Sequence, residues 1–340
     1  MPTTFRGILT VALMLFSSSV VLAQPASTEL RARLAAFEQR TSPAAGDEAE
    51  LAAIADQVLR EAASHGATSD VVVLACSSDF AAANTACHDR LWRIARERST
   101  AVHVRAEAAA ALVRRGDKEA SAALVELARG ASARQLAAMA PSLLALPSEL
   151  SLPIFSRMLS ADEPAATTQA CRALGEIDAF ESRHAVQGFL AATPRGTGEW
   201  YACLLAAAEL GDVSALQEVR FRTPYMRGVD LIAAGQVLLR VDQELGLSLL
   251  MQATRQGTDL LPLEAADRLA AARPDLARDI AEKALRSPDA RARAGGLMVY
   301  RRLMLDPTPE VRSMLADADP SVRVRAAEVV LELRRKRASR

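Results

Sequence analysis

The sequence predicts an all-α protein, a right-handed α-solenoid in which antiparallel helix pairs are stacked side by side. A Leu-Gly-Asp pattern such as Leu210-Gly211-Asp212 recurs along the chain, and a sequence period of roughly 20–50 residues is typical of stacked repeats. Apolar residues recur at spacings of three and four after residue 28, as expected for helices. The chain is 50% hydrophobic but only 4% aromatic, which disfavours sheets because strands prefer aromatic and β-branched side chains.

The N-terminal residues have the three parts of a secretory signal peptide. Arg6 precedes an apolar run from residue 8 to residue 22, and small residues end at Ala23. Serines interrupt this run, which is shorter than the roughly 20 residues of a membrane-spanning helix. We therefore expect cleavage after Ala23, a periplasmic or secreted protein, and no stable membrane insertion after cleavage. An uncleaved membrane anchor is the alternative.

The charge of the chain is balanced. It carries 41 Lys and Arg residues and 41 Asp and Glu residues, so its formal net charge is zero. Loss of Arg6 with the signal peptide would leave one net negative charge. A balanced chain has no global field that would attract nucleic acid or an anionic membrane. The composition therefore predicts no nucleic-acid partner.

Three regions are expected along the chain. Residues 1–23 form the signal peptide, residues 24–98 form an N-terminal helical cap of divergent repeats, and residues 99–338 form the repeat stack. Terminal repeats need a polar outer face, which is the role expected for the cap.

Capping residues before prolines predict helix starts, and glycines predict helix ends. Proline is tolerated at the first helical position because its missing N–H would have no partner there, and glycine closes a last turn in the left-handed conformation. Ser69-Asp70 is expected to cap a buried helix. Gly295-Gly296 lies inside a helical pattern and indicates close packing or a kink. The other expected starts are Ser287-Pro288, Thr308-Pro309 and Asp319-Pro320, and the expected ends are Gly116, Gly175, Gly211 and Gly257.

One apolar residue in the first helix of each repeat aligns the repeats. Successive gaps between these residues are close to thirty, except for one of 36 between Leu174 and Leu210. We expect a loop insertion at residues 192–198 in that repeat, since insertions usually fall on one face of a stack. The aligned residues, called anchor residues below, are Leu112, Leu144, Leu174, Leu210, Leu239, Leu269, Val299 and Val330.

Two stretches carry a resemblance to a known family. Residues 165–178 combine an alanine-rich helix face with a Leu-Gly end, and residues 317–330 open on Asp-Pro and continue through a Val-Arg pair to an alanine-rich face. The pattern resembles HEAT-like repeats of the short, roughly thirty-residue kind, also known from phycobilisome lyases. The resemblance covers most of residues 99–338. It implies that an Asp-Arg pair such as Asp319 with Arg323 ties one repeat to the next.

Four cysteines remain after the signal peptide, and an even number in an exported chain suggests two disulfides. We favour Cys76–Cys87, which would close a short loop between adjacent helices, and Cys171–Cys203, which lie one repeat apart on neighbouring parallel helices. Such a bridge needs Cα atoms within about 7 Å. The alternative is four buried thiols that act as small apolar residues.

Motifs of common catalytic chemistry are missing from the sequence. It contains no Gly-x-Ser-x-Gly elbow, no His-Glu-x-x-His pair and no phosphate-binding glycine loop. Cys87-His88 suggests metal ligands, but there is no Cys-x-x-Cys and the four histidines are scattered. The many carboxylates alternate with arginines on helices, as on solvated faces. We therefore expect no catalytic residue, no metal and no cofactor.

Arginines beside a tryptophan form the first candidate binding surface, because this composition is typical of interface hot spots. Arg93 and Arg96 are three residues apart and would share a helix face. The loop before Trp200 is a second candidate, although core packing explains that residue equally well. The basic tail, residues 334–340, is typical of a solvated helix end. The candidate partner-binding residues are Arg90, Trp92, Arg93, Arg96, Trp200 and Tyr201.

Together these observations predict a non-catalytic exported scaffold that is not an enzyme and that binds a protein or peptide partner along its concave face. Stacked repeats form extended surfaces suited to binding, and a rigid surface loses little entropy when it binds. The resemblance to phycobilisome lyases implies an alternative, a lyase-like enzyme acting on a tetrapyrrole or another small molecule. A buried pocket with several polar side chains near Cys87 and His88 would favour that alternative.

Overall fold

The computed structural model describes most of the chain, and the expected signal peptide lies outside the described ranges. All regular structure within these ranges is helical, which confirms the all-α prediction. None of the described helices has the length and hydropathy of a membrane span. The described ranges are residues 26–39, 47–64, 67–81, 84–177, 180–256 and 260–338.

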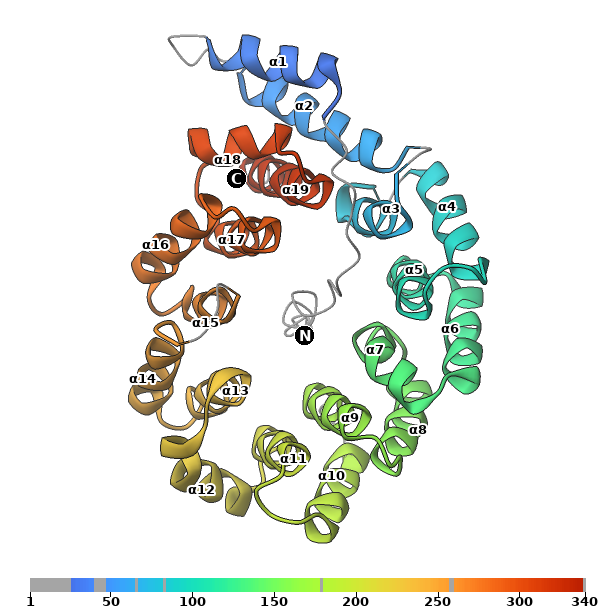
Figure 1. Ribbon diagram of the computed structural model, residues 1–340, viewed down its shortest axis with the longest axis vertical. Coiled ribbons are helices and arrows are strands. Elements are labelled where there is room, and N and C mark those ends of the chain that lie inside the picture. Colours follow the sequence, from blue (N-terminus) through green and yellow to red (C-terminus); the bar gives the residue numbers. More distant parts are fainter. Residues whose placement is uncertain are drawn as a thin grey trace. The chain divides into compact units, whose positions relative to one another are not determined.

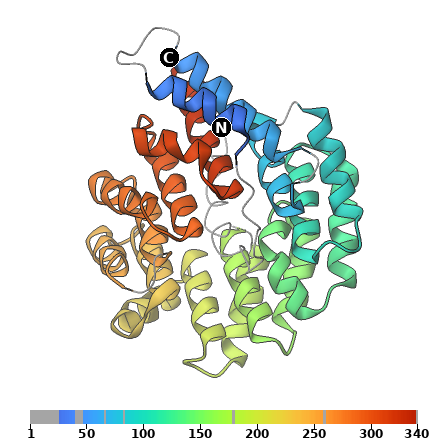
Figure 2. The ribbon, with the colours of Figure 1, turned by 45° about the horizontal axis from the view of Figure 1, so that its top comes forward.

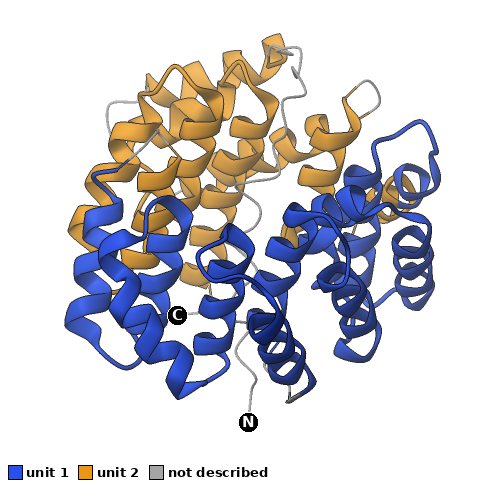
Figure 3. Ribbon diagram, turned by 60° about the horizontal axis from the view of Figure 1, so that its bottom comes forward, with its two compact units in different colours: residues 1–15, 92–257 blue, residues 16–91, 258–340 orange. Residues whose placement is uncertain are grey.

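The chain folds into two compact units (Figure 3). The described part of unit 1 lies between residues 92 and 256, and that of unit 2 comprises residues from 26 to 91 and from 260 to 338. This division follows packing, and the repeat-based boundary after residue 98 stays a prediction.

Unit 1 is a stack of helix pairs in two layers. Its elements are the end of α4 (Thr85–Arg96), α5 (Val102–Arg114), α6 (Lys118–Gly130), α7 (Ala133–Leu143), α8 (Ser148–Leu159), α9 (Pro164–Glu176), α10 (Phe180–Ala192), α11 (Gly198–Glu209), α12 (Val213–Arg222), the 3₁₀ turn η2 (Thr223–Tyr225), α13 (Gly228–Leu238) and α14 (Gln243–Ala253). Odd-numbered helices from α5 to α13 pack side by side in one layer, and each packs against the even-numbered helix that follows it (Figure 1).

Unit 2 combines segments from both ends of the chain. Its elements are α1 (Thr28–Glu38), α2 (Asp47–Ala62), α3 (Ser69–Cys76), η1 (Asp79–Ala81), the start of α4, α15 (Leu261–Leu269), α16 (Pro274–Leu285), α17 (Ala290–Leu303), α18 (Pro309–Ser313), η3 (Met314–Ala316) and α19 (Pro320–Ala338). Helices α15, α17 and α19 pack side by side, and α16 packs against both α15 and α17. Helix α2 packs along α19 (Figure 2).

The contact between α2 and α19 joins residues from opposite ends of the sequence. Leu51 and Ile54 of α2 belong to the same buried apolar cluster as Val329 of α19. Arg337, near the end of α19, forms an ion pair with Glu48 of α2. The N-terminal helices therefore cover the last helix of the repeat stack, a position in which a stack needs a cap.

The repeat register predicted from the anchor residues is confirmed. Each anchor lies in or directly after an odd-numbered helix, from α5 to α19. Most of the anchors are buried, because this position faces the contact between neighbouring helices. The expected loop insertion at residues 192–198 is the connection between α10 and α11.

The Leu-Gly-Asp pattern marks the turn from an odd helix to the next even helix. Gly211 has a φ of 87°, a left-handed conformation that glycine adopts without a Cβ clash. Asp212 then caps α12 by accepting the N–H groups of its first turn. The other oxygen of this carboxylate accepts a hydrogen bond from Gln187 of α10 at 2.7 Å, so one residue ends the turn and ties two even helices. The corresponding residues at the start of unit 1 are Gly116, Asp117 and Trp92.

Two of the expected helix starts are wrong in detail. Ser69 is the first residue of α3, and the residue before it makes no side-chain capping bond. The cap of α17 is Asp289, whose own N–H is bound by the Ser287 hydroxyl. The starts expected at Thr308 and Asp319 are confirmed, since both side chains accept N–H groups of the following helix.

Gly175, expected to end a helix, has a packing role, and Gly296 has the close packing that the sequence indicated. Gly175 lies inside α9, and an added Cβ would come within 3.2 Å of Ala206 on α11. Gly296 lies inside α17, and an added Cβ would come within 2.9 Å of the Ala281 carbonyl oxygen on α16. Both glycines therefore permit close helix packing. Gly257, and Asp178 of the Leu174-Gly175 repeat, lie outside the described ranges.

Candidate functional site

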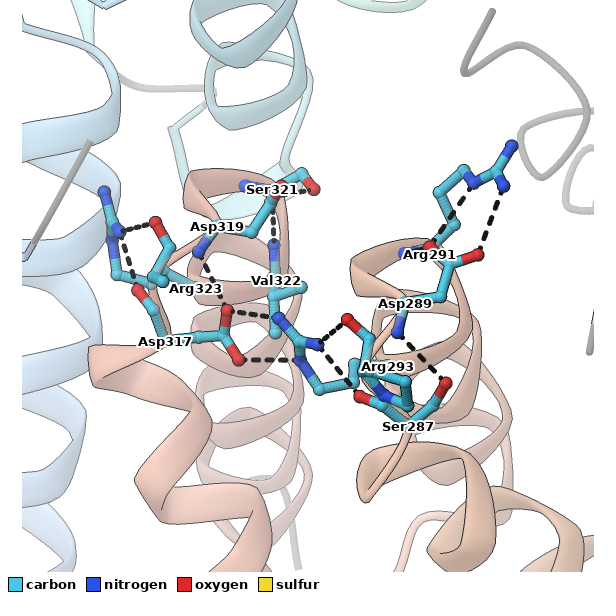
Figure 4. A network of polar contacts seen from close by, with 11 residues as sticks. Ser287, Asp289, Arg291, Arg293, Asp317, Asp319, Ser321, Val322 and Arg323 are labelled. Atoms are coloured by element: carbon cyan, nitrogen blue, oxygen red, sulfur yellow. Dashed lines mark hydrogen bonds and ion pairs between the residues drawn. The ribbon is translucent and has the colours of Figure 1, made fainter. Parts of the chain in front are cut away.

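An arginine–aspartate ladder links the last repeats of unit 2 (Figure 4). Nε and Nη2 of Arg293 on α17 donate to the two oxygens of Asp317, each at 2.8 Å. This hydrogen bonding raises the pKa of Arg293. Nη1 of Arg323 on α19 donates to the backbone carbonyl of Asp317 at 2.7 Å. The family resemblance placed the tie at Asp319, but that side chain accepts N–H groups of its own helix, and Asp317 is the acid that joins the repeats.

A second group of charges spans α15, α17 and α19. Asp267 and Glu328 each lie two residues before the anchor of their helix, and Arg301 and Arg302 follow the anchor of α17 by two and three residues. Because these helices pack side by side, the repeat places the two arginines between the two acids. We call Asp267, Arg301, Arg302, Arg325 and Glu328 the charged cluster.

The half of the charged cluster on α19 is fully paired. Glu328 is only 3% exposed, and its Oε2 accepts hydrogen bonds from Arg301 at 3.2 Å and from Arg325 at 2.8 Å. Two charge-assisted hydrogen bonds of this kind stabilise a buried carboxylate. The hydrogen bond from Arg301 also joins α17 to α19.

The half of the charged cluster on α15 is incompletely paired. Asp267 is 6% exposed, and its Oδ1 has no hydrogen-bond partner. Nε of Arg302 lies 3.6 Å from this oxygen, close enough for charge attraction but too far for a hydrogen bond. Burial raises the pKa of Asp267, and the charges of Arg302, Arg268 and Arg301 act in the opposite direction. A buried polar group without its hydrogen bond costs roughly 1–3 kcal/mol, and perturbed groups of this kind cluster at functional sites.

The backbone after the two arginines of α17 is strained. Met304 has a φ of 55°, in the left-handed region, which costs an L residue roughly 1–2 kcal/mol. The comparable turn of unit 1, after Arg114 and Arg115, uses Gly116 instead. Strain that the rest of a fold sustains is concentrated at functional sites, so Met304 is a second observation at the charged cluster.

The candidate binding residues on α4 have partners inside the fold. Trp92 donates Nε1 to Asp117 at 2.8 Å, and the Arg96 guanidinium lies 4.3 Å from the centroid of the Trp92 ring. Arg93 and Arg96 are exposed, and Arg90 is half-buried. Trp92 therefore ties α4 to the start of α6, and binding of a partner by these residues stays a prediction.

The second candidate surface begins with a buried residue. Trp200 is 4% exposed, and its ring packs edge-on against Tyr201 with a centroid distance of 5.4 Å. The Arg222 guanidinium lies 5.3 Å from the centroid of the Trp200 ring. Core packing accounts for Trp200, and a role of the half-buried Tyr201 in binding stays a prediction.

Both favoured disulfides are present. Cys76–Cys87 joins α3 to α4 with Cα atoms 5.3 Å apart, and Cys171–Cys203 joins α9 to α11 with Cα atoms 4.8 Å apart. No cysteine is free, so Cys87 has no thiol with which to attach a chromophore or bind a metal beside His88. Among the described residues, no group of three or more His, Cys, Asp or Glu side chains is placed to hold a metal ion.

Sequence reasoning misses the charged cluster because it assigns the carboxylates to solvated faces. The anchor register contains the signal that could have found Asp267 and Glu328. In most other repeats the residue two positions before the anchor is small or apolar, as at Ala110, Ala208, Val237 and Leu297, and Arg172 is the charged exception. An acid at such a core-facing position indicates a buried charge.

Comparisons with known proteins find similar solved structures but no family. No family model matches the chain, and no curated protein matches it. Among the similar solved structures is human deoxyhypusine hydroxylase in complex with glycerol, with 15% identity and a TM-score of 0.39 over 73% of this chain and 96% of that one. The HEAT-like stacking is seen directly in the helix layers of each unit. The likeness to phycobilisome-lyase repeats remains a resemblance of sequence pattern.

The prediction of a non-catalytic scaffold that binds a protein or peptide along its concave face is wrong. It depends on a step from the repeat fold to a role without chemistry, and a fold by itself does not determine function. The reaction of deoxyhypusine hydroxylase is not carried over, because a likeness at this level concerns the fold alone. The alternative, an enzyme acting on a small molecule, stays a prediction.

Proposed function

We propose that this chain is an enzyme that acts on a small molecule at the charged cluster of unit 2. The observation that supports this most is Asp267, a buried carboxyl whose Oδ1 lacks a hydrogen bond and whose pKa is raised by burial. The structural pair Arg293–Asp317 in the same unit is hydrogen-bonded through both carboxylate oxygens. This contrast favours a functional role for Asp267 over a structural one.

In the proposed reaction, Asp267 exchanges a proton with the substrate while Arg301 and Arg302 stabilise negative charge. General acid–base catalysis favours a group whose pKa is shifted toward the working pH, and burial shifts Asp267 in that direction. Arginines that are already held by helix packing stabilise a developing anion with little reorganisation. This combination suits lyase-type chemistry, in which loss of a proton leaves negative charge on the substrate.

We place this activity in an oxidising compartment, the periplasm or the cell exterior. The two disulfides support this placement, because such bonds persist mainly in oxidising compartments. Cell fractionation with mass spectrometry of the N-terminus tests it. A mature chain that begins at Gln24 outside the cytoplasm is expected, and an intact Met1 peptide in the cytoplasmic fraction would contradict it.

The activity is tested by incubating the purified mature chain with a small-molecule extract of the cell envelope and profiling the products by mass spectrometry. A compound consumed by the wild type but not by Asp267→Asn is expected. The matched control is Asp56→Asn, since Asp56 is an exposed acid of unit 2 that pairs with Arg60 on the surface of α2. Equal turnover by wild type and Asp267→Asn, or no consumption of any compound, would remove the proposed function.

A further inference from the structure

We infer that the charged cluster binds an oxyanion, a carboxylate or phosphate group of the ligand, and that Arg302 is the residue that holds it. This inference rests on the proposed function for the location of the site, and it adds the chemical class of the ligand and the residue that recognises it.

The first argument is the balance of charge around Asp267. The arginines near the two buried acids are Arg268, Arg301, Arg302 and Arg325. They exceed the acids of the charged cluster, Asp267 and Glu328, by two. Glu264, one turn earlier on α15, reduces this surplus but does not remove it. A surplus of arginine charge on adjoining helices attracts an anion.

The second argument is that the arginines of the charged cluster differ in what they already bind. Arg301 and Arg325 both donate hydrogen bonds to Glu328. Arg302 is ion-paired with Asp267 at 3.6 Å without a hydrogen bond, and its side chain is 45% exposed. Its guanidinium therefore has donors that face solvent, and a guanidinium recognises carboxylate and phosphate oxygens through two parallel hydrogen bonds.

The third argument comes from Arg293, an arginine on the same helix that has a structural role. Arg293 binds both oxygens of Asp317 at 2.8 Å, and its side chain is only 15% exposed. Arg293 is thus bidentate and largely buried, and Arg302 is neither. Met304, two residues after Arg302, has a strained left-handed backbone, and such strain is concentrated at functional sites.

The experiment measures binding of inorganic phosphate and of succinate to the full mature chain by isothermal titration calorimetry. Saturable binding of at least one probe is expected, and the two probes distinguish a phosphate from a carboxylate ligand. Arg302→Gln should weaken binding by about tenfold or more, the loss of charge-assisted hydrogen bonds. Arg302→Lys, which keeps the charge but not the planar fork, should lose less.

The matched control is Arg286→Gln, because Arg286 is an exposed arginine of unit 2 with a similarly long ion pair to Glu310 at 3.8 Å. It should bind the probe as the wild type does. The double variant Asp267→Asn/Arg302→Gln covers the case in which Arg302→Gln alone unfolds unit 2, since it leaves no unpaired buried carboxylate. Unchanged affinity in the Arg302 variants, an equal loss in Arg286→Gln, or no saturable binding of either probe would overturn the inference.

The two proposals can fail separately. Asp267→Asn should abolish turnover and still bind the oxyanion through Arg302. Oxyanion binding without any turnover would remove the enzyme and leave the binding site. Turnover that depends on Asp267 but not on Arg302 would leave the enzyme and remove the oxyanion site.

Discussion

Units 1 and 2 are built from the same repeat, but different interactions hold their odd-numbered helices together. In unit 1 the buried Cys171–Cys203 bond and the close approach of Gly175 to α11 join two neighbouring helices. In unit 2 Arg301 and Arg302 extend from α17 to carboxylates on both neighbouring helices. Unit 1 thus adds a covalent bond and small residues to a half-buried ion pair, Arg172–Asp230 at 3.8 Å, whereas the acids that Arg301 and Arg302 reach in unit 2 are more deeply buried.

This difference indicates where a repeat protein can place chemistry. A covalent bond and apolar contacts leave no polar group to satisfy, whereas a network of buried ions can be left incomplete, as it is at Asp267. An incomplete network reduces stability, and natural proteins break local rules of this kind mainly at functional sites. Asp267 is the buried carboxyl on which the proposed site in unit 2 depends.

The largest expected effect is on the covalent tie of unit 1. Replacing Cys171 and Cys203 with alanine should destabilise unit 1 by about 3–4 kcal/mol, because the bond closes a loop of 32 residues. Trp92 and Trp200 both lie in unit 1, so urea unfolding followed by tryptophan fluorescence reports on that unit. Opening Cys76–Cys87, with a separation of 11 residues, is the control. This bond lies in unit 2, so the fluorescence midpoint that reports on unit 1 should not move. A fluorescence midpoint that does not move in the Cys171 variant would break the comparison.

The next largest expected effect is a difference in stability between variants of the two acids of the charged cluster, Glu328 and Asp267. Glu328→Gln should destabilise unit 2 by about 3 kcal/mol, because it removes the charge that pairs two partly buried arginines. Asp267→Asn should be neutral or stabilising, since it removes a buried carboxyl that lacks a hydrogen bond. Circular dichroism during urea unfolding measures both variants. Equal destabilisation by the two substitutions would show that Asp267 is a structural ion.

A smaller effect concerns the turns that follow the paired arginines in each unit. Met304→Gly should stabilise unit 2 by about 1 kcal/mol, because glycine adopts the left-handed conformation without strain. Gly116→Met in unit 1 should destabilise by a similar amount, although its Cβ would meet no atom within 4 Å. Thermal unfolding of both variants checks the pair. If both substitutions stabilised the protein, or both destabilised it, the backbone angle φ would not be the cause of the change in stability.

The smallest expected effect is on the pH dependence of stability. As the pH falls, the contribution of Asp212 should decrease the stability of unit 1, and that of Asp267 should increase the stability of unit 2. A hydrogen bond from Ser214 lowers the pKa of Asp212 in unit 1 to about 2. Its contribution to stability is therefore complete above a pH of about 4, near the pKa of an unfolded Asp, and is lost as the pH falls toward 2. Burial raises the pKa of Asp267 in unit 2, so its destabilising effect is relieved as the pH falls through its folded pKa.

The variants Asp212→Asn and Asp267→Asn isolate these two contributions. The stability difference between wild type and Asp212→Asn should shrink on acidification. We expect the wild type to be less stable than Asp267→Asn near neutral pH. This difference in the free energy of unfolding should also shrink on acidification, because protonation of Asp267 stabilises the wild type. Denaturant titrations between about pH 5 and pH 2 measure both differences, and a widening deficit for Asp267 would contradict the assignment of its pKa.

Much of the fold could be predicted because its signals are local. Gly211 and Asp212 form one turn, and Cys171 and Cys203 lie one repeat apart, so spacing alone brings each pair together. The site could not be predicted in the same way. The register of Asp267, two residues before an anchor, indicates a core-facing acid, but only packing decides that Asp267 is buried while Asp56 stays on a solvated face.

The sequence by itself determined the repeat period and the positions of the odd-numbered helices, and it favoured the cysteine pairing, because each depends on residues within one or two repeats. Only the tertiary structure decided that α2 covers α19 and that Asp267 and Glu328 lose their water. Burial depends on which distant segments pack over a residue, and the pKa of a carboxyl and the pairing of an arginine follow from burial.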